Sequence, residues 1–326
     1  MELNENININ IDYSPYNIKK CSFGNFITNS EIELLITGEN KSKTKSFLHY
    51  FSHNLNSQNE KEATFLFQSW NYTPSKSINY IIPINLKEQN DTNNNNKNTQ
   101  SSGAFIFSSL VELLSFNNSN NEFEQYLIDD ELYTKPIIEN NLIYGLISNI
   151  GIKIFDLNKK ETKAILYPGK KHIINDYINL KDNKNIIFVC EDRRIYVYDK
   201  TDEKSFISRN HKMEINLICE GSTDGKKFYA YSEEEKKIYL YDIRNINQYV
   251  DIIKDDIEIT KMIYNKLYEK LFFSEFCSEG IVSLDNLKQE SVYEVNCDIK
   301  DFEFNSDFNL MNIITEKNNV NIINVN

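Results

Sequence analysis

The sequence predicts an all-β protein that folds as a single seven-bladed β-propeller. Three observations lead to this fold class. Strand-like segments recur at a fixed interval, the 326 residues provide room for about seven such repeats, and the two ends of the chain complement each other.

The recurring segments lie in the second half of the chain. They read GIKIFDL at 151–157, RIYVYDK at 194–200, KIYLYDI at 237–243 and GIVSLDN at 280–286. Their aspartates, Asp156, Asp199, Asp242 and Asp285, follow one another at intervals of 43 residues. A period of about 40–45 residues, with strands that end in an aromatic or apolar residue and Asp, is typical of propeller blades.

The middle of the chain supplies four regular blades, each predicted as four antiparallel strands that we name a to d from the centre outward. In the third strand of blade four, Ile195 and Val197 alternate with Tyr196 and Tyr198, which is typical of a strand packed on both faces. The expected strands are 135–139, 142–148, 151–157 and 162–167 in blade three; 176–180, 186–190, 195–198 and 205–208 in blade four; 215–219, 227–231, 238–241 and 249–253 in blade five; and 259–264, 271–276, 280–284 and 291–295 in blade six.

The first two blades are more divergent. Blade one is predicted at 18–23, 32–38, 46–51 and 63–70, and blade two at 77–86, 104–108, 111–116 and 123–127. Between the first two strands of blade two, the Asn-rich segment 87–103 contains no apolar residue. Such a segment cannot bury enough surface to offset its ordering entropy, so we expect a disordered loop inserted in this blade.

The two ends of the chain together predict one closing blade. The C-terminal part offers three strands, 299–304, 310–315 and 320–325, and is one strand short. At the N-terminus, Ile7, Ile9 and Ile11 alternate with asparagines in a strand pattern. Pairing this strand with the last blade closes the ring and removes two exposed sheet edges, so residues 1–326 are expected to form one domain.

Composition restricts the classes of partner. The net charge is −12, and acidic clusters outnumber the short basic runs, whereas nucleic-acid binding requires a basic stripe. We therefore expect no direct binding to nucleic acid or to anionic membranes. The N-terminus lacks a signal-peptide pattern, no apolar run approaches ~18 residues, and the five cysteines are dispersed, which together indicate the cytoplasm or the nucleus.

No catalytic, cofactor or metal site is expected. The chain contains no H-E-x-x-H, G-x-S-x-G, Walker A or G-x-G-x-x-G motif, and its nine glycines leave little material for a phosphate loop. His172 with Asp192, and His211 with Glu235, stand before and within blades four and five. We interpret these four residues as structural polar contacts between strands.

The whole chain resembles the WD-repeat propellers, and within them the small WD-repeat nucleoporins of the Y-shaped outer-ring complex of the nuclear pore. The likeness rests on the diverged first blade, on SNIGIKIFDL at 148–157, and on LYDIRN at 240–245 followed by FCSEGIVSLD at 276–285. Where typical repeats carry tryptophan, this chain has Phe155, Tyr198, Tyr241 and Leu284, which marks a divergent member. The resemblance implies a non-catalytic scaffold subunit, a monomeric propeller within a hetero-complex, bound to an α-helical solenoid partner at the nuclear pore.

Two other functions remain open. The first is an adaptor that presents a peptide or client in a ubiquitin ligase, checkpoint or trafficking complex, and the second is an enzyme that uses the central channel of the propeller. Arg193 and Arg194, the only adjacent arginines, are the candidate partner-binding residues, in the turn between the second and third strands of blade four. A scaffold predicts a broad apolar patch on a rim, and an enzyme predicts titratable groups at one mouth of the channel.

Overall fold

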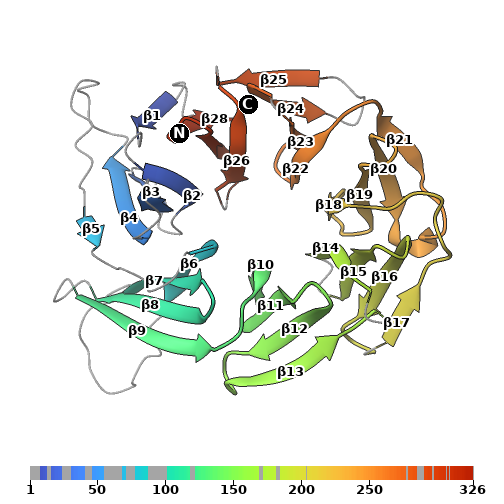
Figure 1. Cartoon of the computed structure of the whole chain (residues 1–326), viewed down its shortest axis with the longest axis horizontal. Helices are drawn as coiled ribbons and strands as arrows, with labels where there is room; N and C mark the ends of the chain where they lie inside the picture. The colour runs from blue at the N-terminus through green and yellow to red at the C-terminus, as the bar shows by residue number, and fades with distance from the viewer. Residues whose placement is uncertain are drawn as a thin grey trace.

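Seven four-stranded antiparallel sheets are arranged as a ring around a central axis in the computed structural model of the chain (Figure 1). The structure describes residues 8–12, 16–23, 31–40, 46–54, 68–70, 78–86, 101–117, 122–168, 172–180, 184–202, 204–276, 278–284, 290–295, 297–305, 307 and 309–325. The predicted seven-bladed propeller is confirmed.

Each expected strand is present, with boundaries shifted by a few residues. Blade one contains β2 (Tyr16–Phe23), β3 (Glu31–Asn40), β4 (Ser46–Asn54) and β5 (Gln68–Trp70); blade two contains β6 (Tyr80–Leu86), β7 (Ser101–Phe107), β8 (Val111–Asn117) and β9 (Glu122–Asp129); blade three contains β10 (Thr134–Glu139), β11 (Leu142–Ile147), β12 (Gly151–Asp156) and β13 (Glu161–Leu166); blade four contains β14 (Ile174–Asn179), β15 (Asn185–Cys190), β16 (Arg194–Asp199) and β17 (Lys204–Ile207). Blade five contains β18 (Leu217–Glu220), β19 (Lys227–Ser232), β20 (Lys237–Asp242), the short 3-10 helix η1 (Ile243–Asn245) and β21 (Asp251–Lys254); blade six contains β22 (Ile259–Asn265), β23 (Lys270–Glu275), β24 (Gly280–Leu284) and β25 (Glu290–Glu294); the closing blade contains β26 (Ile299–Phe304), β27 (Leu310–Thr315) and β28 (Asn319–Asn324).

The closing blade combines both ends of the chain, as predicted. Its fourth strand is β1 (Asn8–Asp12), which lies antiparallel to β28, with Asn8 opposite Ile323 and Asp12 opposite Asn319. The sheet order β1-β28-β27-β26 therefore has three strands from the end of the chain and one from its beginning.

The last three residues of the segment predicted as a loop, 87–103, belong to a strand. Residues 101–103 belong to β7, where Ser101, Ser102 and Gly103 pair with Leu86, Asn85 and Ile84 of β6. Pairing with β6 satisfies the backbone groups of these small residues, although they have no apolar side chain of their own. The rest of the predicted loop, 87–100, lies outside the described residues.

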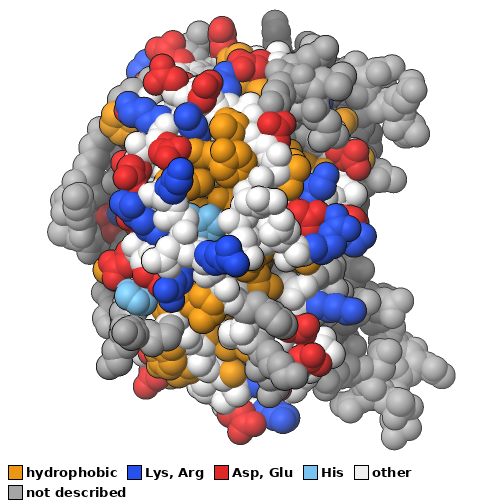
Figure 2. All heavy atoms as spheres, turned by 90° about the vertical axis from the view of Figure 1, so that its right-hand side faces the viewer, with side chains coloured by type: hydrophobic (Ala, Val, Ile, Leu, Met, Phe, Trp, Pro, Cys, Tyr) orange, Lys and Arg blue, Asp and Glu red, His pale blue; other side chains and the backbone are white. Residues whose placement is uncertain are grey.

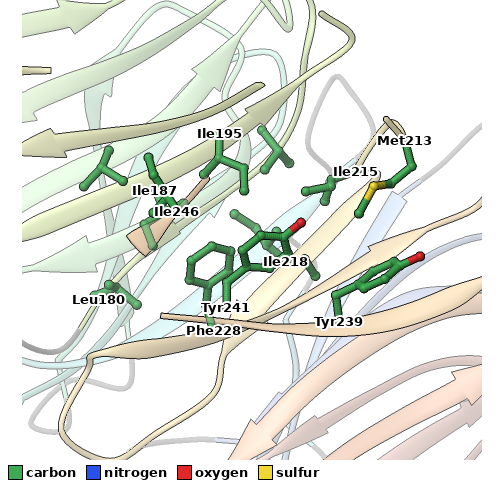
Figure 3. Packing of buried hydrophobic residues seen from close by; sticks show 13 residues of the cluster. Leu180, Ile187, Ile195, Met213, Ile215, Ile218, Phe228, Tyr239, Tyr241 and Ile246 are labelled. Atoms are coloured by element: carbon green, nitrogen blue, oxygen red, sulfur yellow. The ribbon is translucent and has the colours of Figure 1, made fainter. Parts of the chain in front are cut away.

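The hydrophobic core lies between neighbouring blades, because each sheet buries both of its faces. In β16, Ile195 and Val197 pack toward blade five, whereas Tyr196 and Tyr198 pack toward blade three. Figure 3 shows the cluster between blades four and five, where Ile187 and Ile195 from β15 and β16 face residues of blade five. The alternation that predicted β16 thus reflects two different inter-blade clusters.

Substitution of Gly145, which lies at the contact between blades two and three, tests this packing. A Cβ atom at Gly145 would lie 2.0 Å from Cδ1 of Tyr133, which is fully buried and donates a 2.6 Å hydrogen bond to Asp129. The tyrosine ring cannot move aside without losing this bond. We therefore expect Gly145→Ala to reduce the free energy of unfolding by about 2–3 kcal/mol, measured by urea denaturation.

Gly151→Ala is the matched control for this substitution. The added Cβ would lie 2.8 Å from Cε1 of Tyr167, but this ring is 52% exposed and is free to rotate toward solvent. We expect a loss of less than about 1 kcal/mol at this position. Equal losses in the two variants would show that the ring of Tyr133 is not held as described.

Candidate interaction surface

The propeller has two faces of different construction. In every blade the turn between strands b and c lies at the same end as the link from strand d to the next blade, because neighbouring strands are antiparallel. We call this end the b–c face. The a–b and c–d turns form the opposite end, which we call the a–b face.

Arg193 and Arg194 lie on the b–c face, in the β15–β16 turn where the sequence places them. Arg193 donates from Nη1 to the carbonyl oxygen of Lys212 at 2.8 Å, and its Nη2 forms an ion pair with Glu234 at 3.3 Å. Arg194 donates from Nε to Oδ1 of Asn210. The two side chains therefore tie the turn of blade four to the following link and to blade five.

The expected polar pair of blade four is present at longer range than a hydrogen bond. Nε2 of His172 lies 3.7 Å from Oδ2 of Asp192. The same carboxylate accepts a 2.7 Å bond from the Tyr196 hydroxyl and a 3.2 Å bond from the backbone N–H of Arg194. Asp192 thus fixes the turn that carries the two arginines.

In blade five the two candidates have separate partners. Nε2 of His211 lies 3.1 Å from the hydroxyl of Ser208, and Nδ1 lies 3.4 Å from the hydroxyl of Tyr241. Glu235 instead accepts a hydrogen bond from Tyr239. Burial lowers the pKa of His211, so this ring is neutral near pH 7. Its two contacts connect Tyr241 of β20 to Ser208 in the segment between blades four and five.

These contacts predict different costs for the two members of the blade-four pair. Asp192→Ala removes two hydrogen-bond acceptors, so we expect the free energy of unfolding to fall by about 2 kcal/mol. His172→Ala removes two longer contacts of a half-buried ring, at 3.7 Å to Asp192 and 3.8 Å to Glu191, and we expect a loss below about 1 kcal/mol. Thermal denaturation of both variants measures this difference, and a larger loss for His172→Ala would contradict this account of the turn.

A second polar cluster, which we call the channel cluster, lies on the inner strands of blades six, seven and one. Asp301 of β26 accepts from Nζ of Lys261 in β22 at 2.6 Å and also from Nζ of Lys20 in β2. Two residues further along β26, Glu303 accepts a 3.0 Å hydrogen bond from Ser22 of β2. The cluster therefore joins three consecutive blades across the seam where the ring closes.

The same arrangement recurs across the channel in blades three to five. Lys135 of β10 donates to Asp176 of β14 at 2.8 Å, and Oδ2 of Asp176 accepts a 2.9 Å bond from the backbone N–H of Ile218 in β18. The sequence analysis missed these groups. The repeat interval could have predicted these pairs, because Lys135 precedes Asp176 by 41 residues and Lys261 precedes Asp301 by 40, each close to the length of one blade.

The charges of the channel cluster are set by burial and by their partners. Burial alone raises the pKa of a carboxyl group, but Lys261 and Lys20 outweigh it and hold the pKa of Asp301 at about 2. Burial raises the pKa of Glu303, whose hydrogen bond to Ser22 only partly offsets it. The titratable groups of the inner strands are therefore buried or half-buried, and their hydrogen bonds connect neighbouring blades.

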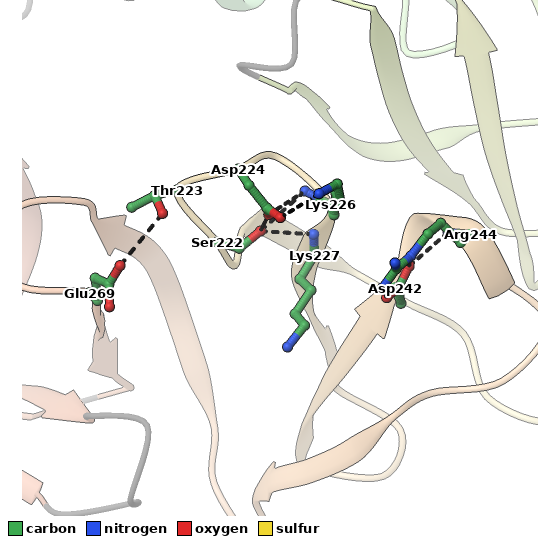
Figure 4. Close-up of polar contacts among 8 residues, drawn as sticks. All are labelled: Ser222, Thr223, Asp224, Lys226, Lys227, Asp242, Arg244 and Glu269. Carbon is green, nitrogen blue, oxygen red and sulfur yellow. Dashed lines mark hydrogen bonds and ion pairs between the residues drawn. The ribbon is translucent and has the colours of Figure 1, made fainter.

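On the a–b face, charged side chains are held by local bonds. In the turn before β19, the backbone N–H of Lys226 donates to Ser222 and to Asp224, and hydrogen bonds from Ser222 and Lys226 lower the pKa of Asp224 (Figure 4). Arg244 forms an ion pair with Asp242 at the start of η1. These bonds stabilise individual turns of blade five.

A small cavity of about 240 Å³ opens between blades three and four. Tyr144 and Tyr198 contribute aromatic walls, and the ammonium group of Lys200 lies 5.8 Å from the centre of the Tyr144 ring. Lys200 is already engaged by Asn179 at 2.8 Å and by Glu139 at 3.4 Å. The cavity is below the usual size of a site for a drug-sized ligand, roughly 300–1,000 Å³.

Within the described ranges, no group of three or more His, Cys, Asp or Glu side chains is placed to hold a metal ion. No helix in the described part of the chain is long and apolar enough to cross a membrane.

Comparison with known proteins supports the fold. No family model matches the chain, and no curated protein matches it in sequence. A chain of a structure titled "Crystal Structure of Mitotic Checkpoint Complex" superposes with a TM-score of 0.64 at 8% sequence identity, covering 97% of this chain and 88% of that one. This likeness shows the fold, a seven-bladed β-propeller.

Proposed function

We propose that this protein is a non-catalytic scaffold, which binds other proteins through the faces and rim of its propeller within a larger complex. The observation that carries this proposal is the state of the polar groups in the channel. Asp301, Asp176 and Glu303 are each hydrogen-bonded to a neighbouring blade, so they contribute to the ring rather than stand free for a substrate.

The exposed rim supports the same function. Large apolar side chains stay exposed along the outer strands and on the b–c face, among them Tyr167 at 52%, Val250 at 58% and Phe276 at 65%. Exposed apolar surface bordered by polar residues is typical of protein-binding sites. These exposed residues are the ones that we expect to contact a protein partner in the cytoplasm or the nucleus.

Two kinds of assembly are candidates for this scaffold. The resemblance of blade one and of the later repeats favours the outer ring of the nuclear pore, with an α-helical solenoid as partner. The structural neighbour from a mitotic checkpoint complex favours the second candidate, an adaptor that presents a peptide or client. In both cases Arg193 and Arg194 are proposed contact residues on the b–c face.

Affinity purification of the full chain from its own cells, followed by crosslinking mass spectrometry, tests the proposal. We expect stoichiometric protein partners crosslinked to the rim or to the b–c face. Helical-repeat partners would favour the nuclear pore assembly, and recovery of clients through a short peptide would favour the adaptor. A chain that is recovered alone, under conditions that preserve other complexes, would refute the scaffold function.

A further inference from the structure

A strip of surface between blades four and five combines cations with exposed apolar side chains. We define this blade four–five strip as Arg194, Ile207, Arg209, Lys212, Tyr249 and Val250. The backbone N–H of His211 donates to the carbonyl oxygen of Arg193 at 2.8 Å, which places the link 208–212 beside the β15–β16 turn. On the other side, the backbone N–H of Arg209 donates to Oδ1 of Asn247 at 2.9 Å.

The cations of the strip have no carboxylate partner among the described residues. Arg193 next to it pairs with Glu234, and Lys236 pairs with Glu258. Arg194, Arg209 and Lys212 form no ion pair with any described residue, and Arg194 is held only by the neutral side chain of Asn210. A concentration of three available positive charges is unusual for a chain whose net charge is −12.

The apolar side chains beside these cations are exposed. Ile207 is 51% exposed, Tyr249 is 44% and Val250 is 58%. The ring of Tyr249 is already fixed, since its centre lies 4.9 Å from that of Tyr239 and 6.4 Å from that of Tyr241. Figure 2 faces this edge of the molecule and shows hydrophobic side chains exposed along it, with Lys and Arg side chains close by.

We propose that the blade four–five strip binds an acidic segment of a partner protein that carries an aliphatic or aromatic anchor. Carboxylates of the segment pair with Arg194, Arg209 and Lys212. These ion pairs orient the segment on the strip and increase its rate of association. The anchor packs on Ile207, Tyr249 and Val250, where a rigid aromatic ring loses little entropy on binding. The inference rests on the proposed scaffold function and assigns to it one surface and one class of partner.

A subtractive peptide selection tests this surface. A library of random 12-residue peptides displayed on phage is selected on the full-length protein, after depletion on the Arg209→Glu/Lys212→Glu variant. We expect the enriched peptides to have a net negative charge and at least one large apolar residue. Measured by fluorescence anisotropy, their affinity should fall at least tenfold for the double variant and for Val250→Ser.

Lys159→Glu/Lys160→Glu is the matched control, because these two exposed lysines lie in the turn after β12 on the a–b face and the charge change is the same. Peptides that are basic or uncharged, or that lose affinity equally in the control variant, would overturn the inference. So would tighter binding of a single-stranded RNA or of anionic phospholipid vesicles to the same residues. Recovery of protein partners by both double variants, with no peptide specific to the strip, would reject this surface and leave the scaffold function intact.

Discussion

Deletion of residues 1–12 is expected to open the ring. The deletion removes β1, which pairs with β28 over five residues, and exposes the edge of β28. Net losses of about 1 kcal/mol for each backbone hydrogen bond sum to about 3–5 kcal/mol, a large share of the 5–15 kcal/mol typical of a folded domain. Differential scanning calorimetry should show a melting temperature lower by about 10 °C, with aggregation on heating.

Deletion of residues 1–6 is the control, because it shortens the chain without removing a residue of β1. The comparison isolates the contribution of the closing strand from any effect of truncation itself. A protein lacking residues 1–12 that stays monomeric and melts with the control would show that the ring is held by other contacts.

Substitution of Asp301 is expected to have the second large effect. Asp301 is 8% exposed and bridges Lys261 and Lys20, which come from the blades on either side. Asp301→Asn leaves two partly buried ammonium groups without their counter-charge. Removing one partner of a buried charge pair costs about 3–5 kcal/mol, and the partial exposure of the lysines places our expectation near the lower end, at about 3 kcal/mol.

The same carboxylate predicts a specific pH dependence. Its pKa in the folded protein is about 2, below its ordinary value of 3.8, so its contribution is complete above about pH 4 and is lost as the pH falls toward 2. The difference corresponds to about 2 kcal/mol. Between pH 4 and pH 2, the wild-type protein should therefore lose more stability than Asp301→Asn, measured by urea denaturation at each pH.

Asp202→Asn controls for the loss of a carboxylate, since Asp202 is exposed in the turn before β17. This variant should follow the pH profile of the wild-type protein. If Asp301→Asn also follows that profile, the two lysines do not stabilise the charged form of Asp301 in the way that their distances indicate.

The regular blades could be predicted because their pattern depends on local packing. The two middle strands of blade four, β15 and β16, bury both faces, so their side chains alternate between two inter-blade clusters, as Ile195 and Tyr196 do. The 43-residue interval then predicted the number of blades, and the strand patterns at the two ends of the chain predicted how the ring closes. The start of β7 was misplaced because Ser101–Gly103 owe their strand geometry to pairing with β6, which no local composition reveals.

The channel cluster escaped prediction for a different reason. Lys261 and Asp301 are 40 residues apart, and their contact arises only when neighbouring blades place their inner strands side by side. In sequence each is a single charge within a short strand, a pattern that also fits a solvated surface. The partners of Arg193 and Arg194 were equally hidden, since Glu234 and Asn210 come from the next blade and from the link before it.

The pairing of β1 with β28 also sets the order of events during synthesis. Asp12 and Asn319 meet across nearly the whole chain, so β1 must wait for about 300 residues to be translated before its partner exists. At ~5–20 residues per second this interval is roughly 15–60 s, during which the inner blades can assemble but the ring stays open. Contacts of such long sequence separation also form late in refolding. Closure of the ring is therefore a late kinetic step. A substitution that weakens the pairing of β1 with β28 will first reduce the yield of folded protein in the cell. It will lower the measured stability of the folded, closed protein only when the pairing is weakened further.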